Sequence, residues 1–432
     1  MAARPNAAPV AGPRFLALGR RAGFAAVAYA FAVTMLGTTL PTPLYAIYQQ
    51  EFGFSELMIT VIFATYAAGV IAALLLFGAL SDQIGRRRAL LPGLALSALS
   101  AVAFLLAQGL GLLLVGRVLS GLSAGMFLGT ATATLVDLAA PEARNRATLV
   151  ATTANIGGLA CGPLLAGLLA EFAGSPLRLT FWVDLALLVP AAVLVWATPE
   201  TVRVSGPVRL RPHRFHLPPE VRPAFLRAAL AGSAGFAVLG LFTAVTPGFL
   251  GQLLGIDSRA TVGLVVFAVF AASTVGQTAL RRVPSELAFR AGCLALIAGM
   301  GVVAVGLALS SLAALVAGGV LAGLGQGLNL RAGLSAVNAA APADHRAEVA
   351  SSFFTVAYVA LSVPVVGVGL LAELTSLRAA GLIFAALVAL LALSVLLLVG
   401  QRNSNQSVES RQPNDQHKRD TRLSRSEPET VG

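Results

Sequence analysis

The chain of 432 residues is 57% hydrophobic, with a mean hydropathy of +0.82, and only 11% of its residues are charged. Soluble domains carry about 25% charged residues, so this composition excludes a water-soluble enzyme of this length and, over most of the chain, a disordered protein. The net charge of +11 would indicate nucleic-acid binding in a soluble protein, but in a membrane protein the positions of the basic residues matter more. We expect an all-α polytopic membrane protein with no nucleic-acid partner.

Twelve apolar stretches, each long enough to cross a bilayer, follow one another along the chain. The first six are expected near 22–48, 55–80, 89–108, 111–138, 147–171 and 177–197, and the second six near 225–250, 260–280, 287–308, 312–338, 349–372 and 377–400. The first stretch is too long for the core of a signal peptide, so we interpret it as a span.

These stretches predict an N-terminal six-helix half at 22–198 and a C-terminal six-helix half at 225–400. The remaining segments are an N-terminal tail at 1–21, a proline-rich and arginine-rich linker at 199–224, and a polar tail at 401–432 that we expect to be disordered.

The positions of the basic residues predict the orientation in the membrane. With the N-terminus inside, the inner tails and connections carry 25 of the 30 Lys and Arg residues and the outer connections carry 3. The other two, Arg117 and Arg331, lie within apolar stretches. This excess predicts that both termini are cytoplasmic. The Arg-rich, Lys-poor composition is typical of a GC-rich bacterial genome and therefore predicts the plasma membrane.

An internal repeat with an offset near 201 residues links the two halves. Residues 118–122 match 320–324, and residues 168–171 match 370–373 in the same order. Because six spans separate the copies, both keep the same orientation, which is a known layout of secondary transporters.

The connection after the second stretch reads GALSDQIGRRR over residues 78–88. It resembles the signature of the major facilitator superfamily, Gly-x-Leu-x-Asp-Arg-x-Gly-Arg-Arg/Lys, with Gln83 where the family usually has arginine. The resemblance implies the fold of that superfamily, with two pseudo-symmetric halves of six helices. A topology signal alone would require only the arginines.

The resemblance also implies a gating motif in this connection. Asp82 would lie at the N-terminal end of helix 11 near Ser351, where the helix dipole attracts a carboxylate, and Arg86 would pair with an acid at the end of helix 4. The expected members are Gly78, Asp82, Gly85, Arg86 and Arg87, with Asp137 as the acid.

Helices 4 and 10 carry glycines at every fourth position, each row with an arginine at one end. Arg117, Gly121 and Gly125 resemble the helix-4 motif of the superfamily, whose arginine faces the central cavity. Arg331 ends the equivalent row of helix 10 and is a second candidate for the cavity. The glycine rows predict either close helix packing or a groove for the substrate.

Helix 5 resembles the Gly-Pro-x-x-Gly-Gly motif of the drug:proton antiporter branch at Gly162, Pro163 and Gly167, with Ala166 in place of the first of the final glycines. Pro364 lies at nearly the equivalent place in helix 11. Prolines among small residues predict a hinge between the halves, although ordinary small-residue packing is an alternative.

Helix 1 contains several threonines with Pro41 and Pro43, which predicts a polar, broken helix whose Thr38 and Tyr45 line the cavity. Asp184 is the carboxylate that lies well inside an apolar stretch, so it is the candidate proton carrier. It could instead form a structural ion pair with Arg117. Glu171 and Glu373 are expected at the outer surface as solvated acids.

Other chemistries have little support in the sequence. The four histidines lie in polar connections and the two cysteines in apolar stretches, so we expect no metal, no cofactor and no enzymatic activity. The predicted function is secondary active transport of a small molecule by alternating access, with proton-coupled efflux as the leading interpretation and a monomer as the functional unit. The alternatives are uptake or exchange of a small organic anion, suggested by Arg117 and Arg331, and a non-transporting membrane sensor or scaffold.

Overall fold

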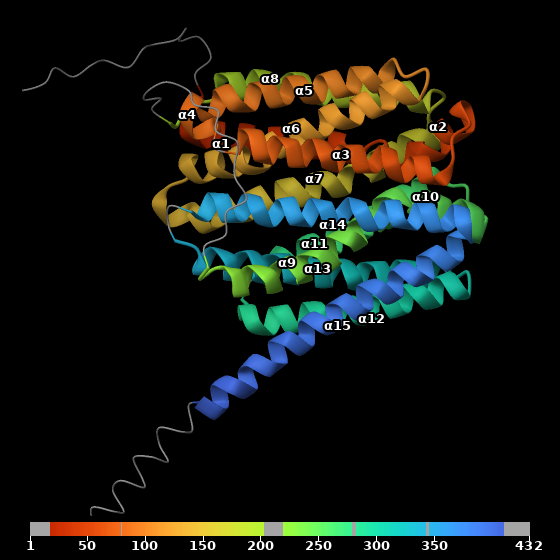
Figure 1. Cartoon of the computed structure of the whole chain (residues 1–432). Coiled ribbons are helices and arrows are strands. Elements are labelled where there is room, and N and C mark those ends of the chain that lie inside the picture. The colour runs from red at the N-terminus through yellow and green to blue at the C-terminus, as the bar shows by residue number, and fades with distance from the viewer. Residues whose placement is uncertain (1–17, 79, 203–218, 279–281, 343–344, 410–432) are drawn as a thin grey trace, which may run out of the picture.

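The computed structural model describes residues 18–78, 80–202, 219–278, 282–342 and 345–409. Within these residues, twelve helices are long and apolar enough to cross a membrane, as the sequence predicts. Figure 1 shows them as one bundle of nearly parallel rods, with the N-terminal half on one side and the C-terminal half on the other.

The N-terminal half contains α1 (Arg20–Thr39), η2 (Thr42–Leu44), α2 (Tyr45–Phe52), α3 (Glu56–Phe77), α4 (Leu80–Ile84), α5 (Arg86–Leu105), α6 (Leu110–Leu138), η3 (Pro141–Ala143), α7 (Arg144–Phe172) and α8 (Pro176–Ala197). The C-terminal half contains α9 (Arg222–Ala244), α10 (Thr246–Gly248), η4 (Phe249–Leu253), α11 (Arg259–Thr278), α12 (Ser285–Ala308), α13 (Leu312–Ala340), α14 (Arg346–Leu374) and α15 (Leu377–Glu409).

The first span of each half is interrupted near a proline. In the N-terminal half α1 ends at Thr39, and a 3-10 turn precedes α2. In the C-terminal half α9 ends at Ala244 and the chain continues through α10 into the π-helical segment η4. Proline lacks the N–H that the next helical turn requires, so the predicted break at Pro41 and Pro43 is present.

The last helix is longer than the sequence suggests. We expected the polar tail to begin at 401, but α15 continues to Glu409, and the first proline after Leu377 that could end it is Pro413. The rest of the predicted tail, 410–432, the N-terminal residues 1–17 and most of the predicted linker, 203–218, lie outside the described residues.

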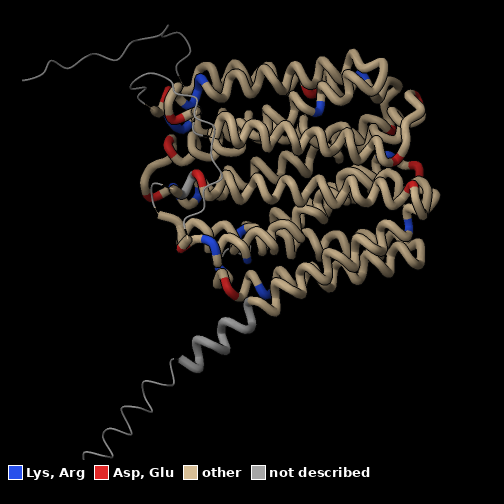
Figure 2. Tube along the Cα trace, in the orientation of Figure 1, with Lys and Arg blue, Asp and Glu red and all other residues tan. Residues whose placement is uncertain are grey.

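The bundle has two distinct ends. The start of α1 and the end of α15 lie at one of them, here called the terminal end, and α2 and α10 lie at the other, here called the distal end (Figure 1). Figure 2 shows that most charged residues gather at these ends and that few lie between them. This separation is expected of a protein whose middle is immersed in hydrocarbon.

The two halves meet along two helix pairs, α7 with α11 and α3 with α14. In the first pair a Cβ atom added to Gly167 would strike the Arg259 carbonyl, and one on Gly263 would strike the Pro163 carbonyl. In the second pair a Cβ on Gly369 would strike the Thr60 hydroxyl. Glycines therefore allow the backbones of the two halves to approach closely.

The sequence repeat has an equivalent in the packing. Gly121 of α6 lies against the Tyr66 carbonyl of α3, and Gly323 of α13 lies against the Val269 carbonyl of α11. One turn farther along, Gly125 and Gly327 repeat these contacts with the carbonyls of Val70 and Ser273. The halves are thus built alike, and these glycines serve close helix packing.

This packing leads to a stability prediction with a matched control. Gly121→Ala should lower the free energy of unfolding by about 1–3 kcal/mol, because the new methyl group overlaps the Tyr66 carbonyl. Gly129→Ala, two turns farther along the same helix and with no atom within 4 Å of the added Cβ, should leave stability unchanged or slightly higher, since alanine favours the helix. Thermal unfolding of both purified variants measures the difference, and equal stability would contradict the packing role.

Candidate functional site

The most deeply buried charged side chain in the described residues is that of Arg117, on α6, which is 1% exposed. Its Nη1 donates a hydrogen bond to the Thr38 carbonyl oxygen at 2.5 Å, and its Nη2 donates to the Tyr45 hydroxyl. Its Nε is buried and has no hydrogen-bond partner. The arginine and the two helix-1 residues that the sequence assigned to the cavity are therefore brought together.

The break in the first span explains why Thr38 can accept this bond. The last carbonyls of an α-helix have no partner within the helix, and α1 ends at Thr39 with Pro41 following closely. Arg117 supplies a charged donor to one of these carbonyls. A cation near a helix C-terminus also interacts favourably with the helix dipole.

Aromatic rings surround the Arg117 guanidinium. Its Cζ lies 5.2 Å from the centre of the Tyr45 ring and 5.9 Å from the centres of the Tyr66 and Phe104 rings. A desolvated cation over aromatic faces gains about 2 kcal/mol from each good contact. These rings and the two hydrogen bonds allow a charge to stay inside the membrane-spanning region.

Asp184 of α8 lies on another face of the same stretch of α1. Its side chain is 2% exposed, and its Oδ1 has no hydrogen-bond partner. A Cβ added to Gly37 would lie 3.0 Å from Oδ2 and 3.1 Å from Oδ1, so Gly37 makes room for the carboxyl group. Arg117 and Asp184 therefore contact consecutive residues of α1, and no ion pair joins them among the described side chains.

Unpartnered polar atoms gather along this span. In addition to Arg117 Nε and Asp184 Oδ1, the hydroxyls of Thr34, Thr42 and Tyr48 are buried without a partner. A buried polar group without a hydrogen bond costs about 1–3 kcal/mol, so a group of them is expected where a protein exchanges contacts with a ligand, water or protons. We call these five residues, together with Thr38 and Tyr45, the α1 site.

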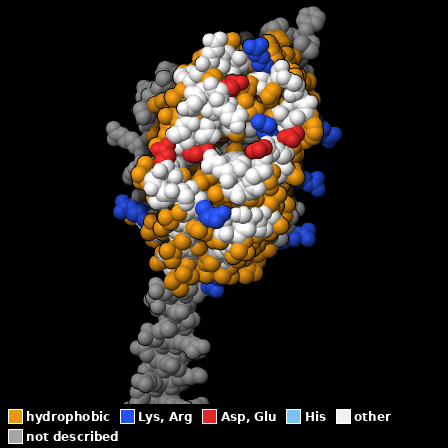
Figure 3. All heavy atoms as spheres, turned by 90° about the vertical axis from the view of Figure 1, so that its right-hand side faces the viewer, with side chains coloured by type: hydrophobic (Ala, Val, Ile, Leu, Met, Phe, Trp, Pro, Cys, Tyr) orange, Lys and Arg blue, Asp and Glu red, His pale blue; other side chains and the backbone are white. Residues whose placement is uncertain are grey.

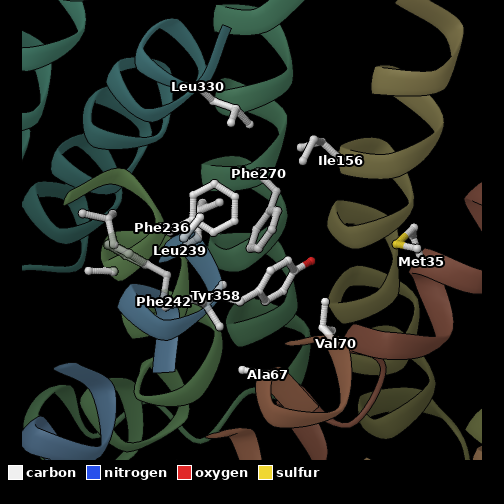
Figure 4. Packing of buried hydrophobic residues seen from close by; sticks show 14 of the residues in the cluster. Met35, Ala67, Val70, Ile156, Phe236, Leu239, Phe242, Phe270, Leu330 and Tyr358 are labelled. Carbon is white, nitrogen blue, oxygen red and sulfur yellow. The ribbon is translucent and has the colours of Figure 1, made fainter. Parts of the chain in front are cut away.

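The centre between the halves is aromatic and apolar. Tyr66 of α3 and Tyr358 of α14 meet edge to face with ring centres 6.3 Å apart, and the ring centre of Phe236 of α9 lies 5.9 Å from that of Tyr358. Figure 4 shows Tyr358 with its hydroxyl pointing away from Phe236 and toward the N-terminal half, beside Phe270. Sequence reasoning missed this group, because single aromatic residues in apolar stretches are usually core residues.

The second candidate arginine of the cavity lies elsewhere. Arg331 of α13 donates from Nη2 to the Val283 carbonyl at 2.9 Å, just before α12 begins at Ser285 and toward the terminal end. The structure does not bring it to Arg117. A glycine row turns around its helix, so position in the row could not predict which way the arginine points.

The helix-5 motif contacts both halves of the protein. Gly162 packs against Thr39 and the Leu36 carbonyl of α1, while Pro163 and Gly167 pack against α11. Pro364 lies half-buried inside α14. Because the motif contacts α1 at Leu36 and Thr39, beside the α1 site, on one face and the other half on the opposite face, movement of α11 against α7 would be transmitted to α1.

The connection between α3 and α5 forms a charged cluster at the terminal end. Arg86 pairs with Asp137 at the end of α6 (Nε to Oδ2, 3.1 Å) and with Asp82 (Nη2 to Oδ1, 2.7 Å), so the expected Arg86–Asp137 contact is present. Gly85 has a φ of +102°, a conformation open to glycine. Arg87 donates to the Trp196 carbonyl at the end of α8.

Glu200 belongs to this cluster, and sequence reasoning missed it. Its carboxylate accepts hydrogen bonds from the backbone N–H groups of Arg86 (2.7 Å) and Arg87 (3.2 Å) at the start of α5. A carboxylate at a helix N-terminus is stabilising. The only sequence signal was an isolated acid directly after the sixth span.

The contacts given above for this cluster join α4, α5, α6 and the end of α8 with Glu200. Among the described residues, Ser351 of α14 makes a contact with the other half at this end: its hydroxyl donates to the Leu74 carbonyl at 3.4 Å and lies 3.8 Å from a Cβ added to Gly78. Asp82 is 59% exposed and pairs with Arg86. The gating role of the motif stays a prediction.

Two acids hold the halves together at the distal end. Glu171, at the end of α7, accepts hydrogen bonds from the backbone N–H groups of Arg259 (2.8 Å) and Ala260 (3.5 Å) at the start of α11. Glu56 of α3 accepts from the Gln252 side chain of η4. Figure 3 shows acidic side chains on this face close to basic ones. Glu171 is exposed, as expected of an acid at the surface, and it also caps a helix of the other half.

The charged cluster around Arg86 at the terminal end predicts which of its two acids, Asp137 or Asp82, contributes more to stability. Asp137→Asn should destabilise the purified protein more than Asp82→Asn, because Asp137 is the less exposed acid and holds both Arg86 and the Thr201 hydroxyl, whereas exposed ion pairs contribute little. Asp82→Asn should slow transport while membrane insertion stays intact. Thermal unfolding ranks the two variants, and an Asp82→Asn protein with wild-type transport rates would contradict a gating role.

Comparison with known proteins agrees with this architecture. The model of the Major Facilitator Superfamily matches residues 23–304, and the chain belongs to this superfamily. The human organic anion transporter TETRAN has a similar fold, with a TM-score of 0.63 at 18% identity over 90% of this chain and all of that one. A bacterial homologue of the human lysosomal transporter Spinster has a TM-score of 0.68 at 15% identity, covering 90% of this chain and 98% of the other.

Curated relatives are similar over part of the chain. The multidrug resistance protein MdtL of Escherichia coli O81 (strain ED1a) is 27% identical over 210 residues, 48% of this chain and 52% of the relative. A triacylglyceride transporter of Mycolicibacterium hassiacum is 31% identical over 191 residues, 44% of this chain and 33% of the relative. The chain thus aligns with about half or less of the length of these relatives. The family and its named members are transporters, and this chain is a multi-pass membrane protein.

Proposed function

We propose that this protein exports a small, largely apolar aromatic molecule in exchange for protons, by alternating access of its two halves. The observation that carries the proposal is the α1 site, where a buried arginine and a buried carboxyl group contact consecutive residues of the broken helix α1. The relatives named as multidrug and triacylglyceride transporters support an apolar substrate.

Contacts at both ends support alternating access. At the distal end the Glu171 carboxylate holds the start of α11, and at the terminal end Ser351 holds the end of α3. Passage in either direction requires one of these contacts to open while the other holds. The polar contacts named at each end are few, two acids at the distal end and Ser351 at the terminal end, so opening either end breaks few hydrogen bonds.

The proposed coupling uses Asp184 as the proton carrier and Arg117 as the residue that senses its charge. When Asp184 is ionised, the two opposite charges attract across the Gly37–Thr38 backbone, and when it is protonated this attraction is lost. Either change alters the force on α1, which also packs against Gly158 and Gly162 of α7. Proton binding would thus be transmitted to the α7–α11 contact between the halves.

Exchange of an organic anion has less support than efflux. The sequence offered two arginines for an anion, but Arg331 contacts the Val283 carbonyl near the terminal end, and Arg117 is already bonded to Thr38 and Tyr45. The aromatic surroundings of Tyr66 and Tyr358 suit an apolar ring system better than a carboxylate.

A gradient experiment on reconstituted vesicles tests the proposal. With an acidic interior and the membrane potential clamped, protons flow outward through an antiporter and drive its substrate inward. We expect accumulation of ethidium, a permanent cation that a pH gradient alone does not trap, and no accumulation of carboxyfluorescein. Accumulation of carboxyfluorescein would support the anion alternative, and movement of neither probe would contradict this proposal.

A further inference from the structure

An apolar groove of about 610 Å³ opens on the side of the N-terminal half, between α7 and α8 and over α1. Its lining includes Val33 and Leu36 of α1, Leu149 and Val150 of α7, and Leu187 of α8. The α7 residues Thr153 and Cys161 in its lining are exposed, so the groove opens outward, away from the buried centre of the bundle. In a membrane this opening faces lipid.

The groove has the dimensions of a lipid chain. It follows α7 from Leu149 to Cys161, twelve residues or about 18 Å at 1.5 Å per residue. One leaflet of hydrocarbon is about 15 Å thick, half of the bilayer core. An apolar groove does not retain water, and acyl chains are the apolar molecules that surround it.

Two arginines lie beside this groove at its end nearest the terminal end of the bundle. Arg146 lies three and four residues before Leu149 and Val150, on the same face of α7. Arg21 lies near the start of α1, which runs parallel to α7 in constant register, because Gly158 packs on Ala32 and Gly162 on Leu36. Extending this register puts Arg21 and Arg146 within one residue of the same depth.

Both arginines are available to a ligand. Each is exposed, and the ion pairs between described side chains involve other residues. They lie at the end of the bundle that the arginine distribution predicts to be cytoplasmic, and anionic lipids are abundant in the cytoplasmic leaflet. Basic pockets between membrane helices on that side are typical binding sites for anionic headgroups.

We propose that this groove binds an anionic phospholipid, with one acyl chain along α7 and the phosphate between Arg21 and Arg146. The arginines give the site its preference for a negative headgroup, and the groove gives it a preference for lipid over free phosphate. This site is separate from the proposed transport path, so either proposal can fail without the other.

The exposed thiol of Cys161 reports on occupancy of the groove, because the other cysteine, Cys293, is fully buried. We would measure alkylation of Cys161 in the purified full-length protein, in detergent with added dioleoyl phosphatidylglycerol or dioleoyl phosphatidylcholine. Native mass spectrometry of the same samples would count bound lipids. We expect phosphatidylglycerol to slow alkylation at least fivefold and phosphatidylcholine less than twofold.

Matched variants test the contributions of the lipid headgroup and of the acyl chain to binding separately. Arg21→Gln with Arg146→Gln should remove the preference for phosphatidylglycerol, whereas Arg144→Gln should keep it, because Arg144 lies on another face of α7. Gly157→Leu should abolish lipid retention in the mass spectra by filling the groove. A Cβ at Gly157 meets only the Thr153 methyl group, at 3.9 Å, whereas one at Gly158 would strike the Ala32 carbonyl, so the Gly157 variant should fold.

Several results would overturn the proposal. Equal protection by the two lipids, or full protection by phosphatidylglycerol in the double variant, would show that the arginines hold no headgroup. Protection by inorganic phosphate alone would show an anion site without a lipid chain. Protection that rises with protein concentration and not with lipid would assign the groove to a second copy of this chain. Thermal unfolding of each variant confirms that it is folded.

Discussion

Arg117→Gln is expected to reduce transport at least tenfold, the largest loss among single substitutions in the α1 site. Glutamine cannot reach the Thr38 carbonyl and the Tyr45 hydroxyl together, and it carries no charge to interact with the surrounding rings. Each buried group left unpaired costs about 1–3 kcal/mol. Arg117→Lys keeps the charge but not the two-pronged geometry, so it should retain more transport than Arg117→Gln. Initial rates of ethidium uptake into vesicles measure both variants.

A structural role for Arg117 makes a different prediction. If the arginine only stabilised the fold against Asp184, then Arg117→Gln would lose folded protein and Asp184→Asn would restore it. A snorkelling arginine would tolerate lysine without any effect, although a side chain that is 1% exposed leaves no path to the surface. Folded yield and thermal unfolding, measured beside the transport rates, separate these cases, and full activity of Arg117→Lys would contradict the functional role.

Asp184→Asn is the second substitution with a large expected effect. Asparagine keeps the shape of the side chain next to Gly37 but cannot change charge, so proton-driven accumulation of ethidium should fall to simple equilibration across the vesicle membrane. Substrate binding should remain, because Asp184 is separated from the aromatic centre by α1. Accumulation ratios under an imposed pH gradient measure the effect.

Asp257→Asn is the matched control for this experiment, because Asp257 is exposed in the segment between η4 and α11. It should accumulate ethidium as the wild type does. An Asp184→Asn protein that still concentrates ethidium under a pH gradient would remove Asp184 from the coupling mechanism. Gly37→Ala offers an independent check, since its methyl group would displace the carboxyl group by close contact and should also impair accumulation.

Much of the fold was predictable, because the features that determine it can be read directly from the sequence. Length and apolar composition give the twelve spans, the prolines at 41 and 43 give the break in the first span, and the repeat gives the equivalent packing of Gly121 and Gly323. The exception is α15, which continues past the membrane segment because polar composition alone does not end a helix.

The candidate site was predictable in its members and not in its contacts. A buried arginine in helix 4 and polar residues in helix 1 stand out in the sequence, but the way Gly37 and Thr38 separate Asp184 from Arg117 depends on three helices packing together. The contacts of Glu200 with α5 and of Glu171 with α11 join residues 114 and 88 positions apart. An acid next to a span looks the same in sequence whether it meets water or a helix N-terminus.

The most direct test of proton-coupled exchange at the α1 site is to measure protons released when substrate binds. Ethidium would be added to the purified protein in unbuffered solution, with a pH indicator as the readout. We predict release of about one proton per bound ethidium in the wild type and none in Asp184→Asn, whose ethidium binding is verified in parallel by fluorescence. Binding without proton release in the wild type, or equal release in Asp184→Asn, would contradict the account.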